Sequence, residues 1–364
     1  ITRTNPLLKK ADTPHGTPLF AEIKLEHYMP AFEYALEEER KDIDRIVNNT
    51  EEPTFENTIV ALERSGEALN HVATIFFTLN SAETSPEMDA IAMEIQPKLV
   101  AQSNDINLDP VLFGRVKAVY DNRDKFDLDD QDKMLLDKTY KSFVRKGAGL
   151  DEDKKALYRE YSSELSQLTL KFGQNVLAAT NAFAINIPAA DSDKVAELPE
   201  FVREGMAAEA KARGEEGWTV TLQTASMVPF LTYSTDRELK KELWTKYNSR
   251  CMEGGDNDNN DNIRRITELR LLIANLLGYR TFADYVLEER MAENVPNVDN
   301  FMKELLVATQ KYARKEYDEI NAYAKKGGAK SDIMPWDWSY YTEKYKAEKY
   351  ALNNEELKPY LELE

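Results

Sequence analysis

The residues that most often bind a catalytic zinc ion are sparse in this sequence and far apart. Its three histidines are His15, His27 and His71. A zinc site on one helix needs two histidines three to five residues apart, as in H-E-x-x-H, because that spacing puts both rings on one face. No such pair occurs. We therefore interpret His27 and His71 as structural residues and predict neither a metal ligand nor a catalytic residue within these 364 residues.

Nucleophilic and nucleotide-dependent chemistry also lacks a recognisable motif. The sequence contains no G-x-S-x-G elbow, no P-loop and no G-x-G-x-x-G fingerprint. Cys251 is the only cysteine, which excludes an intrachain disulfide and a multi-cysteine metal site. Nucleophilic catalysis by Cys251 would need a nearby base, and its neighbours Arg250, Met252 and Glu253 offer none. We interpret Cys251 as an unreactive thiol at a helix end.

An acidic loop of glycine, aspartate and asparagine has part of a calcium-binding pattern. Asp256, Asp258 and Asn260 occupy positions one, three and five of an EF-hand loop. The glycine required at position six and the glutamate required at position twelve are both missing. The sequence therefore favours a solvated loop in which Asp261 or Asn262 caps the following helix.

Aromatic side chains are concentrated near the C-terminal end of the sequence. Such a cluster forms either a packed core or a wall that binds peptides, because aromatic rings with polar tips combine contact area with hydrogen bonding. Composition alone favours a core. The candidates for a peptide-binding wall are Trp336, Trp338, Tyr340 and Tyr341, in a set that also contains Tyr345, Tyr350 and Tyr360.

The composition narrows the class of protein that carries these residues. The chain has 47 Lys and Arg against 65 Asp and Glu, a formal net charge of −18. Nucleic-acid binding draws on clustered basic residues, so this balance argues against a nucleic-acid partner. The hydrophobic share of 42% supports a large core. No apolar run approaches the roughly 18 residues of a membrane span, so we expect a soluble globular protein.

Helical periodicity dominates the sequence and predicts a mostly α fold, a multi-helix array of about ten helices. Apolar residues in the segment 30–48 fall on one stripe with charged residues opposite, as in a surface helix. Ser85 and Asp109 each precede a proline, so each should cap a helix that begins there. Gly147 should end another helix in the left-handed conformation. Later helices are expected at 198–213, 237–247, 263–277, 282–290 and 298–324.

The most regular segment predicts a long helix from about Glu152 to Leu177. Its apolar residues recur at spacings of four and three over about five turns, which indicates one buried face and an organising role in the fold. The residues expected on that face are Leu157, Tyr161, Leu165, Leu168 and Phe172.

Two short segments change from helical periodicity to alternation. They are Phe183–Ile187 and Trp218–Leu222. Alternation of this kind predicts strands, and these two are expected to form one small strand pair in an otherwise helical chain.

Several phrases, kept in one order from end to end of the chain, match a known family. They are TPLFAEIK at 17–24, EHYMPAF at 26–32, PTFENTI at 53–59, FLTY at 230–233, LLGY at 276–279, WD at 336–337 and YY at 340–341. Together they resemble the thimet oligopeptidase family of zinc metallopeptidases. The Gly16-Thr17-Pro18 lead-in looks most like its dipeptidyl carboxypeptidase branch.

The resemblance implies a peptidase that hydrolyses short peptides, with zinc as the cofactor of the full-length enzyme. In that family the zinc is bound by H-E-x-x-H and a downstream glutamate, which lie C-terminal to the Trp-Asp and Tyr-Tyr phrases. This sequence ends at Glu364 without them. The resemblance therefore implies the N-terminal half only, truncated before the zinc-binding catalytic region, without zinc or activity of its own.

By the same resemblance, these residues form one wall of a deep, narrow helical channel. The channel admits short unstructured peptides, and the branch releases dipeptides from their C-termini. Residues 1–180 would be an N-terminal helical region, and residues 181–364 a second helical region that contains the strand pair. The protein partner would be the missing C-terminal catalytic half of the same chain.

Two questions stay open at this point. A helical protein-interaction module without enzymatic activity is the alternative to a peptidase. The cytoplasm is the expected location, with the periplasm or export as the alternative, because the chain starts at Ile1 and does not show its native N-terminus.

Overall fold

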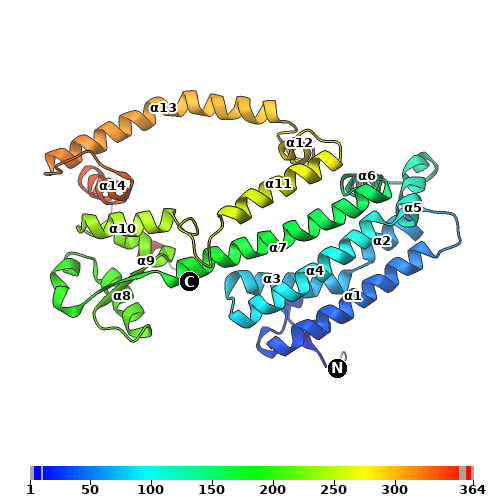
Figure 1. The fold of residues 1–364 in the computed structure, drawn as a ribbon, viewed down its shortest axis with the longest axis horizontal. Coiled ribbons are helices and arrows are strands. Elements are labelled where there is room, and N and C mark those ends of the chain that lie inside the picture. Colours follow the sequence, from blue (N-terminus) through cyan, green and yellow to red (C-terminus); the bar gives the residue numbers. More distant parts are fainter. Residues whose placement is uncertain (1–3, 10, 352–357, 362–364) are drawn as a thin grey trace. The chain divides into compact units, whose positions relative to one another are not determined.

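The structure of the chain, a computed structural model, describes residues 4–9, 11–351 and 358–361. These residues contain fourteen α-helices and one two-stranded sheet, which confirms the mostly α fold with a single strand pair (Figure 1). The helices outnumber the predicted ten, partly because Ser65 and Gly66 separate α2 from α3 within one continuous apolar pattern. None of the described helices combines the length and the apolar character needed to cross a membrane.

The chain folds into two compact units, which are described separately here. Unit 1 comprises residues 1–171 and 262–288, and unit 2 comprises residues 172–261 and 289–364. The helices of unit 1 are α1 (Leu25–Val47), α2 (Ala61–Arg64), α3 (Glu67–Ala82), α4 (Pro86–Leu108), α5 (Pro110–Asp121), α6 (Asp130–Arg145), the first part of α7 (Glu152–Ala182), most of α11 (Asn260–Leu276) and α12 (Phe282–Leu287).

Side chains at the helix termini of unit 1 act as the sequence predicts. The hydroxyl of Ser85 accepts a hydrogen bond from the Met88 N–H at the start of α4. The carboxylate of Asp109 accepts the N–H groups of Val111 and Leu112 at the start of α5. These bonds satisfy donors that have no partner within the helix. Gly147 follows α6 with φ +90°, which confirms the predicted left-handed helix end.

The core of unit 1 is built from the apolar stripes of its helices. Phe32 and Phe76 are fully buried, and their rings meet edge to face where α1 packs on α3. Tyr28 adds a second edge-to-face contact with Phe76. A second cluster joins α1, α5 and α6 through residues such as Ile46 and Leu112. The stripe predicted on the segment 30–48 is therefore confirmed as a buried helix face.

The long helix α7 forms as predicted, but its predicted buried face is wrong. Leu157 is exposed, and Tyr161, Leu165, Leu168 and Phe172 are only half-buried. The buried residues of α7 are polar instead: Lys155, Asn175 and Thr180.

Hydrogen bonds between polar side chains explain this arrangement of α7. Ser166 and Ser162 accept hydrogen bonds from Gln96 (2.8 Å) and Asn104 (2.9 Å) of α4. Farther round the helix, Glu164 forms a two-pronged ion pair with Arg265 of α11. Short polar residues face the neighbouring helices, so the apolar residues lie at the margins of these contacts.

Unit 2 contains the strand pair and the remaining helices. β1 (Ala184–Ile187) and β2 (Trp218–Thr221) are antiparallel, with Ile185 opposite Val220, and they confirm the two predicted strands. Val220 and the helix residues Met206 and Phe230 share a buried cluster that joins the sheet to α8 and α9. The helices of unit 2 are the end of α7, α8 (Glu200–Ala212), α9 (Thr224–Tyr233), α10 (Arg237–Asn248), α13 (Val295–Lys326) and α14 (Pro335–Tyr350).

Candidate functional site

All four aromatic candidates lie on one helix of unit 2, α14. Pro335 occupies its first turn, where a missing N–H is tolerated. The carboxylate of Asp337 accepts the Met334 N–H (2.9 Å), and this bond closes the N-terminus of the helix. α14 contacts α9, α10 and α13, so it is enclosed by helices on more than one side (Figure 1).

Trp336 and Tyr340, four residues apart, share the side of α14 that faces α10. The Trp336 ring meets Trp244 of α10 edge to face, with 5.8 Å between ring centroids. Its indole N–H is buried and finds no hydrogen-bond acceptor among the described residues. The ammonium of Lys240, also on α10, lies 4.1 Å from the centroid of the Tyr340 ring.

Trp338 and Tyr341 lie on the side of α14 that faces α13. Trp338 stacks on Tyr317 of α13, with the two ring planes 3° from parallel. Tyr341 packs against a small buried cluster that includes Ile320 and Ile333. The four aromatic residues therefore contact different neighbouring helices, as their spacing on a helix of 3.6 residues per turn requires, while the rings of Tyr340 and Tyr341 meet edge to face with centroids 5.1 Å apart.

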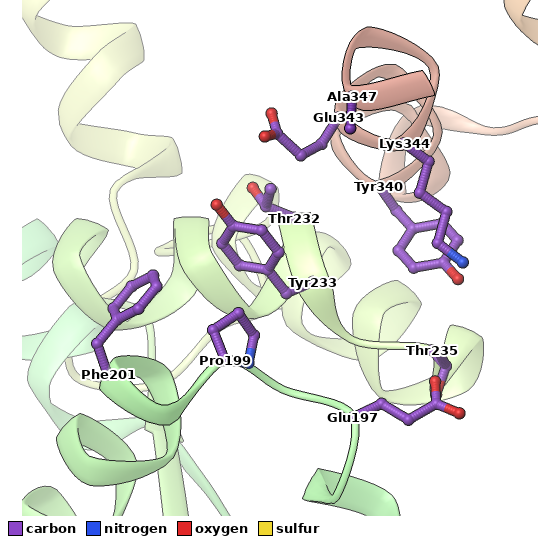
Figure 2. A pocket seen from close by; sticks show the side chains of 10 residues that line it. All are labelled: Glu197, Pro199, Phe201, Thr232, Tyr233, Thr235, Tyr340, Glu343, Lys344 and Ala347. Atoms are coloured by element: carbon purple, nitrogen blue, oxygen red, sulfur yellow. The ribbon is translucent and has the colours of Figure 1, made fainter. Parts of the chain in front are cut away.

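Tyr340 is the candidate that lines a cavity. This cavity, about 530 Å³ in volume, lies between α14, α9 and the start of α8 (Figure 2). Phe201 and Tyr233 form an edge-to-face pair on its α8 and α9 side. The residues around it are Glu197, Pro199, Phe201, Thr232, Tyr233, Thr235, Tyr340, Glu343, Lys344 and Ala347.

The walls of the cavity mix aromatic rings, hydroxyl groups and charges of both signs. Lys344 and Tyr340 extend from α14 beside each other, and the Lys344 ammonium lies 4.5 Å from the centroid of the Tyr340 ring (Figure 2). Glu343 forms an ion pair with Lys346 (2.7 Å). Such a surface can hold a peptide through ring contacts and through hydrogen bonds to its backbone.

A basic group that the sequence analysis missed lies beneath Tyr340. Lys240 is 2% exposed, and among the described residues no carboxylate forms an ion pair with it. Burial lowers the pKa of Lys240 to about 8, since a charged ammonium loses its hydration there. The sequence carries a partial signal for this burial. Lys240 directly follows Leu239 and lies three residues before Leu243, on a helix that begins soon after the matched phrase FLTY.

An ion pair ties α10 to α14. Arg237 of α10 donates to both carboxylate oxygens of Asp337 of α14, with Nε–Oδ1 at 3.0 Å and Nη2–Oδ2 at 2.8 Å. The hydrogen bond to Asp337 raises the pKa of Arg237. This pair and Lys240 hold α14 against α10, and α14 in turn places Tyr340 and Lys344 at the cavity.

The three histidines lie on separate elements of unit 1. His15 is exposed in a short turn, and His71 is exposed on α3. His27 Nδ1 accepts the Lys24 N–H (3.0 Å) at the start of α1, a structural role that agrees with the interpretation from the sequence. Within the part of the chain that the structure describes, no three His, Cys, Asp or Glu side chains are grouped to hold a metal ion. The described residues thus do not fit a catalytic zinc site.

Cys251 and the acidic loop are the two remaining features that the sequence analysis considered. Burial raises the pKa of the half-buried Cys251 thiol, which opposes thiolate formation. In the acidic loop, the carboxylate of Asp258 accepts the N–H groups of Asn260 (2.8 Å) and Gly254 (2.7 Å). The prediction that Asp261 or Asn262 caps the next helix is wrong, because α11 begins at Asn260 and includes both residues in its first turn.

Comparison with known proteins identifies the class of protein. A model of the neurolysin and thimet oligopeptidase N-terminal domain matches residues 32–155. A model of peptidase family M3 matches residues 230–364, which include the α9 and α14 residues that line the cavity. The two matches lie in order along the chain. The chain therefore belongs to peptidase family M3.

Individual relatives match nearly all of the chain. It is 32% identical over 367 residues to dipeptidyl carboxypeptidase of Escherichia coli K12, a match that covers 100% of this chain and 53% of that protein. It is 31% identical over 364 residues to oligopeptidase A of Haemophilus influenzae, covering 99% of this chain and 52% of that protein. The chain thus spans about half the length of the curated relatives it matches.

Proposed function

We propose that the chain is the N-terminal, substrate-channel part of a zinc metallopeptidase that hydrolyses short peptides. The observation that carries this proposal is the match along the whole chain to dipeptidyl carboxypeptidase and oligopeptidase A, each about twice as long. The zinc ligands and the catalytic base would belong to the remainder of the full-length protein. On this proposal, the 364 residues alone do not hydrolyse peptides.

The cavity beside α14 is the proposed contribution of this part to substrate binding. Its rings, hydroxyls and charges suit a short extended peptide, whose side chains and backbone both need partners. The four aromatic candidates remain proposed channel residues, with Tyr340 foremost because it lines the cavity. Trp336, Trp338 and Tyr341 would act chiefly by holding α14 in position through their contacts with α10 and α13.

Release of C-terminal dipeptides is the proposed reaction. Identity is 32% to the dipeptidyl carboxypeptidase of Escherichia coli and 30% to the oligopeptidase A of the same organism, and the Gly16-Thr17-Pro18 lead-in resembles the former branch. The proposed location is the cytoplasm. One plant relative is named a probable cytosolic oligopeptidase A, and another is named organellar.

The test of this proposal is an assay of the polypeptide extended through the remainder of its open reading frame. Two peptides of one sequence are compared, one with a free C-terminal carboxylate and one with an amidated C-terminus. We expect rapid release of a dipeptide from the free peptide and slow cleavage of the amidated one. Equal cleavage of both would favour an endopeptidase. Cleavage of neither would favour a helical interaction module.

A further inference from the structure

Much of the longest helix of unit 2 has no neighbour. α13 runs from Val295 to Lys326, and every residue from 299 to 316 is exposed. Most helical stability in proteins comes from packing of an apolar face against a neighbour. Within unit 2, no described residue supplies such packing to this part of α13. We therefore expect another polypeptide segment to pack on the apolar side chains of this part of α13.

Most of the apolar residues on this part of α13 follow one stripe, which we call the α13 stripe; the exposed Leu306 and Val307 lie outside it. Its members recur at helical spacings over about 21 Å of helix: Val298, Phe301, Met302, Leu305 and Tyr312. Charged residues such as Lys303, Lys311 and Arg314 lie on the opposite side. The α13 stripe thus has the pattern of a buried helix face without being buried.

At the C-terminal end of the same helix, this face is buried against other residues of unit 2. About two and three turns beyond Tyr312, the residues on this side of α13 are Ile320 and Ala324, and both are buried against Ile333 beneath α14. α14 covers only this end of α13, as Figure 1 shows. This side of α13 is therefore packed at its C-terminal end and open before it, with the exposed Glu316 between the two parts, and exposed apolar surface of this kind marks an interaction site.

We propose that the α13 stripe is the surface on which the remaining, C-terminal part of the same polypeptide packs. The proposal rests on the proposed function. Its occupant follows from length: the chain covers only 53% of its dipeptidyl carboxypeptidase relative, and the family M3 match continues to the last residue of the chain, Glu364. On the proposed function, about as much polypeptide again would be available to cover a helix that the present residues leave open.

The test compares two positions two residues apart on α13. Leu305 lies on the stripe, and Val307 lies on the opposite side and is 80% exposed. Single cysteines are placed by Leu305→Cys or Val307→Cys in a Cys251→Ser background, because Cys251 is the only native cysteine of these residues. Trypsin cleavage after Lys303 and Lys311 yields one peptide that carries either cysteine. Mass spectrometry of that peptide then gives the rate of thiol labelling in the native protein.

In the 364-residue chain both cysteines should react rapidly. In the extended polypeptide we expect labelling at position 305 to slow about tenfold or more, while labelling at 307 stays fast. Equal rates at both positions, or equal protection of both, would overturn the proposal, as would an open reading frame that ends at Glu364.

A second copy of the chain is the competing occupant of the stripe. Sedimentation of the 364-residue chain should give a monomer of 41.7 kDa. A dimer that Leu305→Asp disrupts and Val307→Asp preserves would assign the stripe to self-association and overturn the proposal.

Peptide hydrolysis by the extended polypeptide separates this proposal from the proposed function. Protection of position 305 without hydrolysis would retain the interface and reject the peptidase. Hydrolysis without protection of position 305 would retain the peptidase and reject the interface.

Discussion

Arg237 and Asp337, one hundred residues apart in sequence, form a two-pronged ion pair that joins α10 to the first turn of α14. Asp337 is 2% exposed and also accepts the Met334 N–H that closes the helix start. One carboxylate therefore fixes both where α14 begins and where it lies. Tyr340 follows Asp337 by a single turn, so this pair sets the position of the residue that lines the cavity.

Removal of this carboxylate should destabilise unit 2. We expect Asp337→Ala to lower the free energy of unfolding by about 2 kcal/mol, since the Arg237 guanidinium loses its partner in a half-buried position. The control is Asp332→Ala, which breaks an exposed pair with Lys325 and should change stability by less than about 0.5 kcal/mol. All four tryptophans lie in unit 2, so denaturation followed by tryptophan fluorescence reports on it. Equal losses for both variants would contradict the structural role of the pair.

Lys240 should make stability depend on pH in the alkaline range. Its pKa is about 8 in the folded protein, below its usual 10.5. Between these values the unfolded chain binds the proton and the folded protein does not, so the free energy of unfolding rises with pH. Below about pH 8 the lysine is charged in both states, and this effect is constant. The charged groups that act on it are Asp337, Arg237, Lys344 and Asp236.

Comparison of the free energies of unfolding of the original protein and Lys240→Met isolates this effect, because the other titrating groups contribute equally to both proteins. From about pH 7.5 to about pH 10, the stability of the original protein relative to the variant should increase by about 2 kcal/mol. Tryptophan fluorescence during denaturation at the two pH values measures it. A relative stability that falls or stays constant would show that Lys240 is hydrated in the folded protein.

The helix α7 should tolerate truncation of Leu165 better than the core of unit 1 tolerates truncation of Phe76. Phe76 is fully buried and Leu165 is half-buried. We expect Phe76→Ala to cost about 3–5 kcal/mol and Leu165→Ala about 1 kcal/mol. Hydrogen exchange of the α1, α3 and α7 amides measures both losses. A larger loss for Leu165→Ala would restore the buried α7 face that the sequence suggested.

Two glycines near β2 provide a matched test of whether the surrounding backbone leaves room for a Cβ atom. Gly217 and Gly214 have φ of +89° and +73°. A Cβ at Gly217 would lie 2.2 Å from the Ile187 carbonyl oxygen, whereas a Cβ at Gly214 meets nothing within 4 Å. Gly214→Ala should cost about 1 kcal/mol for its backbone conformation, and Gly217→Ala at least about 2 kcal/mol more. Fluorescence of the adjacent Trp218 follows both, and indistinguishable variants would show that the strand pair can shift without cost.

Local signals predicted most of the elements but not the burial of α7. Ser85 and Asp109 cap helices by contacts within three residues, which a sequence shows directly. The environment of α7 depends on Gln96, Asn104 and Arg265 of other helices. Apolar spacing alone cannot show that hydrogen bonds between polar side chains occupy those contacts.

The candidate site was predictable only in part for a similar reason. Tyr340 was found because aromatic residues are concentrated around it. Its neighbours Phe201 and Tyr233 come from helices more than one hundred residues earlier, and no spacing rule connects them. Lys240 was missed because its burial depends on how α14 packs against α10.

On the proposed function, these residues are part of a zinc peptidase whose catalytic groups lie elsewhere in the full-length protein. The most direct test of this proposal is the hydrolysis of a short free peptide by the extended polypeptide and by the 364-residue chain, each with and without a zinc chelator. We expect hydrolysis by the extended form alone, abolished by the chelator and restored by added zinc. Chelator-sensitive hydrolysis by the 364-residue chain, or no hydrolysis by the extended form, would contradict it.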